Sequence, residues 1–410
     1  MKKLLTVIIF LVSLSSFAFA AQAQTQTVKE SLLPQGMPET ISLLDTTPLF
    51  PKPDDKLKSW ASLRPQEVKV VRTQFGDSGY ANPSGHTWIE IHTAWLGDMW
   101  IEEDNSKIGV IRPFDADLNL AVETPLYDHP YREAANGARL STQTVHAKAE
   151  FVSPSGFNAI QIETSWLGDQ WLLQPQIKNG AAETLSFPDA ISPDYGSLMT
   201  INDIHIIKLG GSTFIQGQLV LQKEAWNVGR IKLSLGEYMV SGELSFWNKS
   251  GDVIAQAPYA VYTHAGQNLT APILLPVDQD LSSAVIATLQ DTFPLYISLP
   301  LPPLLNLTDP EGKVLLGILR QQQTGDYSVA KAWISGKLPG SHDYKLTLTF
   351  YSNDNRIIGT AHVHQRLNGP LTPDQAAPEG GGANDLIDMV GKGDWTNYYQ
   401  VDIHIDQVSD

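Results

Sequence analysis

The sequence predicts an all-β chain in which two small barrels precede two β-sandwiches. Two repeats support this: a tryptophan-rich strand–turn–strand motif occurs twice in the first half, and a different hairpin pattern occurs twice in the second half. Many segments alternate apolar and polar residues, as half-buried strands do. With 42% hydrophobic and 18% charged residues, the 410-residue chain has the composition of a globular protein with several domains.

The N-terminus has the features of a secretory signal peptide. Met1-Lys2-Lys3 is positively charged, Leu4 to Ala20 carries no charge, and Ala18-Phe19-Ala20 has the small-x-small form of a cleavage site. The alternative is an uncleaved anchor helix, but the apolar run is slightly shorter than the ~20 residues that cross a bilayer. No later stretch is apolar enough to do so, and we therefore expect an exported chain without a membrane span.

The motif of the first half is a repeat. Trp95-Leu96-Gly97-Asp98-Met99-Trp100 recurs 71 residues later as Trp166-Leu167-Gly168-Asp169-Gln170-Trp171. Upstream, Thr47-Pro48-Leu49-Phe50 matches Thr124-Pro125-Leu126-Tyr127 at an offset of 77, which places an insertion near Gly76–Tyr80 of the first copy. A Gly-Asp pair between two strands is typical of a hairpin, so we expect the turns at Gly97-Asp98 and Gly168-Asp169. Each copy is long enough for a small barrel.

The full pattern is Trp-x-x-Ile-x-Thr-x-Trp-Leu-Gly-Asp-x-Trp-Ile, preceded by a Val-x-Val strand. It resembles the bacterial SH3-like domains of exported Gram-positive proteins, over residues 43 to about 178. The resemblance implies two tandem SH3-like modules that are non-catalytic and bind cell-wall peptide. The second copy departs from the pattern where Ala159 stands in place of Trp88. If that aromatic lines a groove, the second module has lost part of it.

The aromatic and turn residues divide into two expected roles. The regular motif positions are expected in the core or in the turn: Trp95, Gly97, Asp98, Trp100, Trp166, Gly168, Asp169 and Trp171. Aromatic residues near loops are expected at the surface, where they form a candidate ligand-binding groove: Phe50, Tyr80, Trp88, Tyr127 and Phe157.

The second half contains its own repeat. The turn Asn248–Asp252, with strands on both sides, recurs 104 residues later at Ser352–Asn355. Units of this length fit β-sandwiches, and the hairpins resemble those of immunoglobulin-like modules on bacterial surfaces. The dense prolines of residues 293–303 predict an extended linker. Residues 369–393 predict a long loop with one helical turn at Asp385–Val390.

These patterns give one set of domain boundaries. We expect a signal peptide at 1–20, a linker at 21–42, SH3-like module 1 at 43–115, SH3-like module 2 at 116–180, a linker at 181–198, β-sandwich 1 at 199–292, a proline-rich linker at 293–308 and β-sandwich 2 at 309–410.

Composition and motifs exclude several classes of partner and of functional site. The formal charge of −16 argues against nucleic acid as a partner, and the absence of cysteine excludes disulfides, thiol nucleophiles and cysteine metal sites. The strongest metal candidate is the pair His362 and His364, but two imidazoles do not complete a site. No catalytic motif stands out, and the distinctive residues are duplicated, which favours modular binding. We therefore expect no metal, no cofactor and no catalytic residue.

The sequence thus predicts a secreted, cell-wall-associated, non-catalytic protein. Its SH3-like modules would bind peptidoglycan or another wall polymer, and its sandwiches would act as spacers or bind a protein partner. Two alternatives stay open. One is an envelope hydrolase with a site in residues 199–410, and the other is a self-assembling surface-layer or spore-coat protein.

Overall fold

The chain is all-β, which confirms the predicted class. The computed structural model describes residues 38–54, 57–75, 87–103, 107–131, 135–153, 157–178, 186–193, 196–227, 237–264, 266–291, 305–369 and 385–409. Within these ranges the ordered elements are strands, apart from one 3-10 turn, η1 (Lys223–Asn227). The expected signal peptide, most of the first linker, Tyr80 and the prolines of 293–303 lie outside the described residues.

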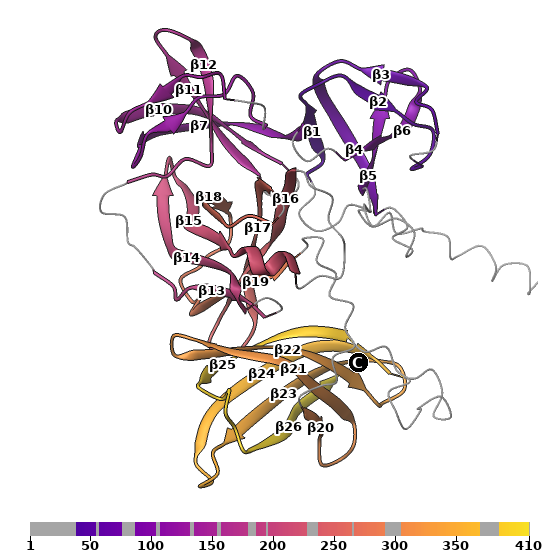
Figure 1. The fold of residues 1–410 in the computed structure, drawn as a ribbon. Helices are drawn as coiled ribbons and strands as arrows, with labels where there is room; N and C mark the ends of the chain where they lie inside the picture. The colour runs from indigo at the N-terminus through magenta and orange to yellow at the C-terminus, as the bar shows by residue number, and fades with distance from the viewer. Residues whose placement is uncertain are drawn as a thin grey trace, which may run out of the picture. The chain divides into compact units, whose positions relative to one another are not determined.

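The chain divides into two compact units, residues 1–103 and 104–410. Module 1 is the described part of the first unit (Figure 1). Its sheet has the antiparallel order β1 (Thr40–Leu43), β4 (Gln66–Phe75), β5 (Thr87–Thr93) and β6 (Gly97–Glu102). A short hairpin, β2 (Thr47–Leu49) with β3 (Ala61–Leu63), joins β6 through two backbone hydrogen bonds of 2.8 Å between Phe50 and Trp100.

Module 2 (residues 107–178) repeats this architecture. Its sheet order is β7 (Ile108–Asn119), β10 (Thr144–Val152), β11 (Asn158–Thr164) and β12 (Gly168–Leu173). The hairpin of β8 (Thr124–Pro125) with β9 (Arg139–Leu140) is again tied to the last strand, here between Tyr127 and Trp171. The register shift between Val70 and Arg72 recurs between Ala147 and Ala149. The two copies thus share their topology and their irregularities.

Barrel 1 (residues 186–291) and barrel 2 (residues 305–409) are each one seven-stranded sheet that nearly closes on itself. Barrel 1 contains β13 (Ala190–Ser192), β14 (Gly196–Leu209), β15 (Ser212–Leu221), β16 (Glu237–Trp247), β17 (Val253–His264), β18 (Leu269–Val277) and β19 (Ile286–Asp291). Barrel 2 contains β20 (Leu305–Thr308), β21 (Val314–Thr324), β22 (Tyr327–Gly336), β23 (Ser341–Tyr351), β24 (Ile357–Asn368), β25 (Asp385–Gly393) and β26 (Gln400–Ser409).

The two barrels have the same circular order of strands. Barrel 1 reads β17-β16-β19-β13-β14-β15-β18, and barrel 2 reads β20-β21-β22-β25-β24-β23-β26. Within each barrel the strands can be numbered from first to seventh in chain order. In both barrels, their order around the ring is then first, second, third, sixth, fifth, fourth and seventh. The ring is open between β17 and β18 in barrel 1 and between β20 and β26 in barrel 2. A sandwich has two separate sheets, whereas each barrel here is continuous, so the immunoglobulin-like likeness stays a prediction.

Several element positions differ from the expected boundaries. The boundary at 115/116 falls inside β7, which pairs with β10 from Val110 to Asn119. The expected linker at 181–198 contains β13 and the start of β14, and Ala190 belongs to the core of barrel 1. The helical turn expected at 385–390 is instead part of β25, because its residues pair along β22. Strand pairing with distant residues decides these positions, and local composition does not report it.

Candidate functional site

The Trp-Leu-Gly-Asp motif forms the β5–β6 hairpin of module 1. Its turn consists of Ala94, Trp95 and Leu96, and it ends directly before the Gly97-Asp98 pair at which the turn is expected. The Thr93 hydroxyl accepts a hydrogen bond from the Leu96 amide at 3.1 Å and donates one to the Gly97 carbonyl at 2.8 Å. Gly97 has a φ of +70°, the left-handed conformation that closes a three-residue hairpin loop. Threonine and glycine in the motif are therefore required by the turn.

Module 2 builds the same turn with the same groups. Thr164 accepts from the Leu167 amide at 3.0 Å and donates to the Gly168 carbonyl at 3.0 Å. Gly168 has a φ of +68°. The hairpin is thus a repeated local structure, and the sequence repeat follows from it.

The four motif tryptophans separate into two environments. Trp100 and Trp171 are buried, at 5% and 6% exposure, and their backbones bond to Phe50 and Tyr127. Trp95 and Trp166 are 60% and 58% exposed, which differs from the core position expected for them. The reason is geometric, because a side chain at the tip of a hairpin has no facing strand to cover it.

The residues expected to line a groove do not gather at the surface. Trp88 is 2% exposed and packs edge-on against Phe50, with the ring centroids 5.2 Å apart. Phe157 is 4% exposed and packs edge-on against Tyr262 of barrel 1 at 5.9 Å. Phe50 and Tyr127 are half-buried in the bridges to β6 and β12, and Tyr80 is outside the described residues.

Each hairpin tip also carries a half-exposed carboxylate that lies close to a nitrogen-bearing side chain. Asp98 lies 2.7 Å from the Nδ1 atom of His92, and both side chains are exposed. At the equivalent place in module 2, Asp169 forms an ion pair with Lys148. Each hairpin therefore carries an exposed tryptophan in its turn and an aspartate at the start of the strand that follows. An aromatic face packs on the apolar side of a flat ligand, while carboxylates accept hydrogen bonds from hydroxyl or amine groups.

The position of Trp95 and Trp166 in the most regular part of the motif favours a place in the core. The sequence nevertheless contains a local signal that places both tryptophans in a turn. Each tryptophan lies two residues after a threonine and two before a glycine, which is the spacing of a three-residue turn with a left-handed closing residue.

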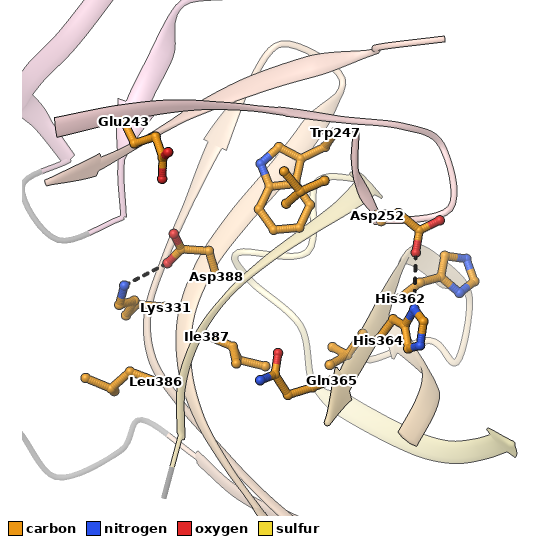
Figure 2. A pocket seen from close by; sticks show the side chains of 13 residues that line it. Glu243, Trp247, Asp252, Lys331, His362, His364, Gln365, Leu386, Ile387 and Asp388 are labelled. Carbon is orange, nitrogen blue, oxygen red and sulfur yellow. Dashed lines mark ion pairs between the residues drawn. The ribbon is translucent and has the colours of Figure 1, made fainter. Parts of the chain in front are cut away.

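A second candidate site is a pocket of about 550 Å³ lined by both barrels. Figure 2 shows Trp247 between two ion pairs, with Lys331–Asp388 on one side and Asp252–His364 on the other. The Lys331 ammonium lies 2.9 Å from Asp388, and the His364 imidazole lies 3.8 Å from Asp252. Burial raises the pKa of the Glu243 carboxyl, which also lines the pocket and accepts a hydrogen bond of 2.8 Å from Gln256.

The histidines of this pocket do not converge on a common point. His362 lies 3.1 Å from the Thr347 hydroxyl, and His364 faces Asp252. His342 is engaged elsewhere, 2.8 Å from the Pro339 carbonyl. In the described part of the chain, no group of three or more His, Asp or Glu residues is placed to hold a metal ion.

Comparison with known proteins adds no identification. No protein-family model, no curated protein and no solved structure matches this chain. No helix in the described ranges is long and apolar enough to span a membrane. The resemblance to SH3-like modules therefore stays a prediction from the motif.

Proposed function

We propose that this chain is a non-catalytic, exported cell-envelope protein whose two SH3-like modules bind a wall polymer through their hairpin tips. The observation that carries the proposal is the exposed indole at the same turn position in both modules. Folding accounts for the other motif residues: threonine and glycine form the turn, and the second tryptophan is in the core. The tip tryptophan has no such role.

The class of ligand follows from the chemistry of the tip. An open indole beside a carboxylate suits the sugar rings and peptide amines of peptidoglycan. The net charge of −16 disfavours a strongly anionic polymer such as a teichoic acid. The two barrels then serve as spacers or as sites for a protein partner.

Binding of the purified protein to isolated Gram-positive peptidoglycan tests this proposal, with and without teichoic acid. Aromatic contacts contribute about 0.5–1.5 kcal/mol each beyond the area they bury. We therefore expect the double variant Trp95→Ala, Trp166→Ala to bind roughly 5- to 150-fold more weakly. Trp60→Ala is the matched control, because Trp60 is 69% exposed in module 1 but lies outside the hairpin.

Equal binding by the wild type and the double variant would show that the hairpin tips are not part of the binding site. No binding by the wild type would show that peptidoglycan is not the ligand. The envelope hydrolase and the surface-layer protein would then be tested directly. Stoichiometric zinc in the purified protein would favour an envelope hydrolase, and assembly into large particles would favour a surface-layer protein.

A further inference from the structure

The pocket lined by both barrels lies at a packed junction in the larger compact unit. Trp247 of barrel 1 forms an apolar cluster with Val329 of β22 and Val390 of β25. The β16–β17 turn beside Trp247 fits tightly, since a Cβ on Gly251 would lie 2.7 Å from the His362 carbonyl oxygen. Packing therefore fixes the walls of the pocket, and its volume of about 550 Å³ is that of a small-molecule site.

One side of the pocket carries two carboxyl groups and one ammonium group. Lys331 and Asp388 are partners across β22 and β25, two residues along each strand from the valines that cluster with Trp247. The Lys331 ammonium lies 2.9 Å from the Asp388 carboxylate, whose side chain is only 1% exposed. Glu243 lies on the same side of Trp247 (Figure 2) and accepts a hydrogen bond from the neutral amide of Gln256. With Glu243 ionised, two carboxylates and one ammonium leave this side with a charge of −1.

The opposite side of the pocket carries one carboxyl group, that of Asp252. One of its oxygens accepts a hydrogen bond of 3.1 Å from the Asn248 amide, and the other lies 3.8 Å from the His364 imidazole. His362 of the same strand also lines the pocket, with its imidazole 3.1 Å from the Thr347 hydroxyl. With histidine counted as neutral at pH 7, this side also has a charge of −1.

Apolar side chains line the pocket together with these charges. Trp247 lies between the two charged sides (Figure 2), and Val253 and Leu386 line the pocket at 41% and 55% exposure. Accessible apolar surface inside a pocket favours a ligand with a hydrocarbon body over a bare ion. The pocket thus combines two separated negative charges with an apolar surface.

We propose that this pocket binds a linear aliphatic diamine, with one ammonium group at Glu243 and the other at Asp252. Each side of the pocket has one carboxylate more than its cations neutralise, and a diamine supplies two ammonium groups joined by methylene groups that pack against Trp247. A single cation would neutralise only one side, and an anion would be repelled by both. Burial raises the pKa of the Glu243 carboxyl, and an ammonium group beside it would favour the ionised form.

Isothermal titration calorimetry of the full chain with putrescine and cadaverine tests the proposal. Butylamine is the matched control ligand, because it has the hydrocarbon chain of putrescine but one ammonium group. We expect one diamine per chain, bound roughly tenfold or more tightly than butylamine, since that is the lower end expected for a hydrogen bond to a charged group. No binding of either diamine, or equally tight binding of butylamine, would overturn the proposal.

Two isosteric variants locate the site. Glu243→Gln and Asp252→Asn each remove one negative charge, and each is expected to weaken diamine binding roughly tenfold without a change in circular dichroism. Asp354→Asn is the matched control, because Asp354 is a half-exposed residue of the equivalent turn in barrel 2 and does not line the pocket. It should leave diamine binding unchanged. The formal charge of −16 attracts any cation to the chain, and such non-specific binding would be lowered equally in all three variants. That result would refute the site, and peptidoglycan binding plays no part in either measurement.

Discussion

Replacing Trp88 by alanine tests whether this residue belongs to the core of module 1 or to a ligand groove. Trp88 is 2% exposed and meets the Phe50 ring edge-on at 5.2 Å. An indole buries about 150–250 Å², which corresponds to about 4–6 kcal/mol at roughly 25 cal/mol per Å². Losses measured for such truncations are about 3–5 kcal/mol, and we expect module 1 to lose that much stability.

Hydrogen exchange measured by mass spectrometry is suited to this multi-domain chain, because it reports each strand separately. Exchange in β5 of the Trp88→Ala variant is expected to accelerate by about two to three and a half orders of magnitude, since ~1.4 kcal/mol is tenfold. The equivalent strand β11 in module 2 is the internal control. It carries Ala159 at this position and should not change.

The outcome separates core from groove. If β5 exchange changes by less than tenfold, Trp88 is not part of the core. The matched variant is Trp95→Ala, for which we expect a stability change within about 0.5 kcal/mol because its side chain is 60% exposed.

Two further predictions concern backbone and charge. Gly97→Ala should cost module 1 about 1–2 kcal/mol from its φ of +70° alone, whereas Gly251→Ala should cost more, because its Cβ would also lie 2.7 Å from the His362 carbonyl oxygen. Hydrogen exchange in β5–β6 measures the loss of stability in Gly97→Ala, and exchange in β16–β17 measures it in Gly251→Ala. Equal losses in the two variants would contradict the close packing at Gly251. Burial raises the pKa of the Glu150 carboxyl in the folded protein, although the charge of Arg112 opposes this shift. The folded state therefore binds the proton more tightly than the unfolded state, whose pKa is 4.5. The resulting stabilisation is present below the unfolded pKa and is lost as the pH rises through the folded pKa. The stability of Glu150→Gln relative to wild type should therefore increase from pH 4 toward neutrality in urea titrations, and a difference that does not vary with pH would contradict this.

The sequence by itself determined the β class and both duplications. Turn chemistry is local, so the sequence identifies Gly97 and Gly168 as turn residues. The turns are nevertheless centred on Trp95 and Trp166, two residues before these glycines. The repeat at an offset of 104 likewise located the hairpins around Asn248 and Ser352, because strand–turn–strand patterning depends on neighbouring residues.

Only the tertiary structure decided which aromatics are exposed and which strands pair. Trp95 and Trp100 lie in one motif, yet one has no facing strand and the other bridges to Phe50. Phe157 is covered by Tyr262, more than a hundred residues away, and β25 is a strand because β22 pairs with it. Burial and strand pairing are set by partners distant in the chain, and a pattern of neighbouring residues does not record them.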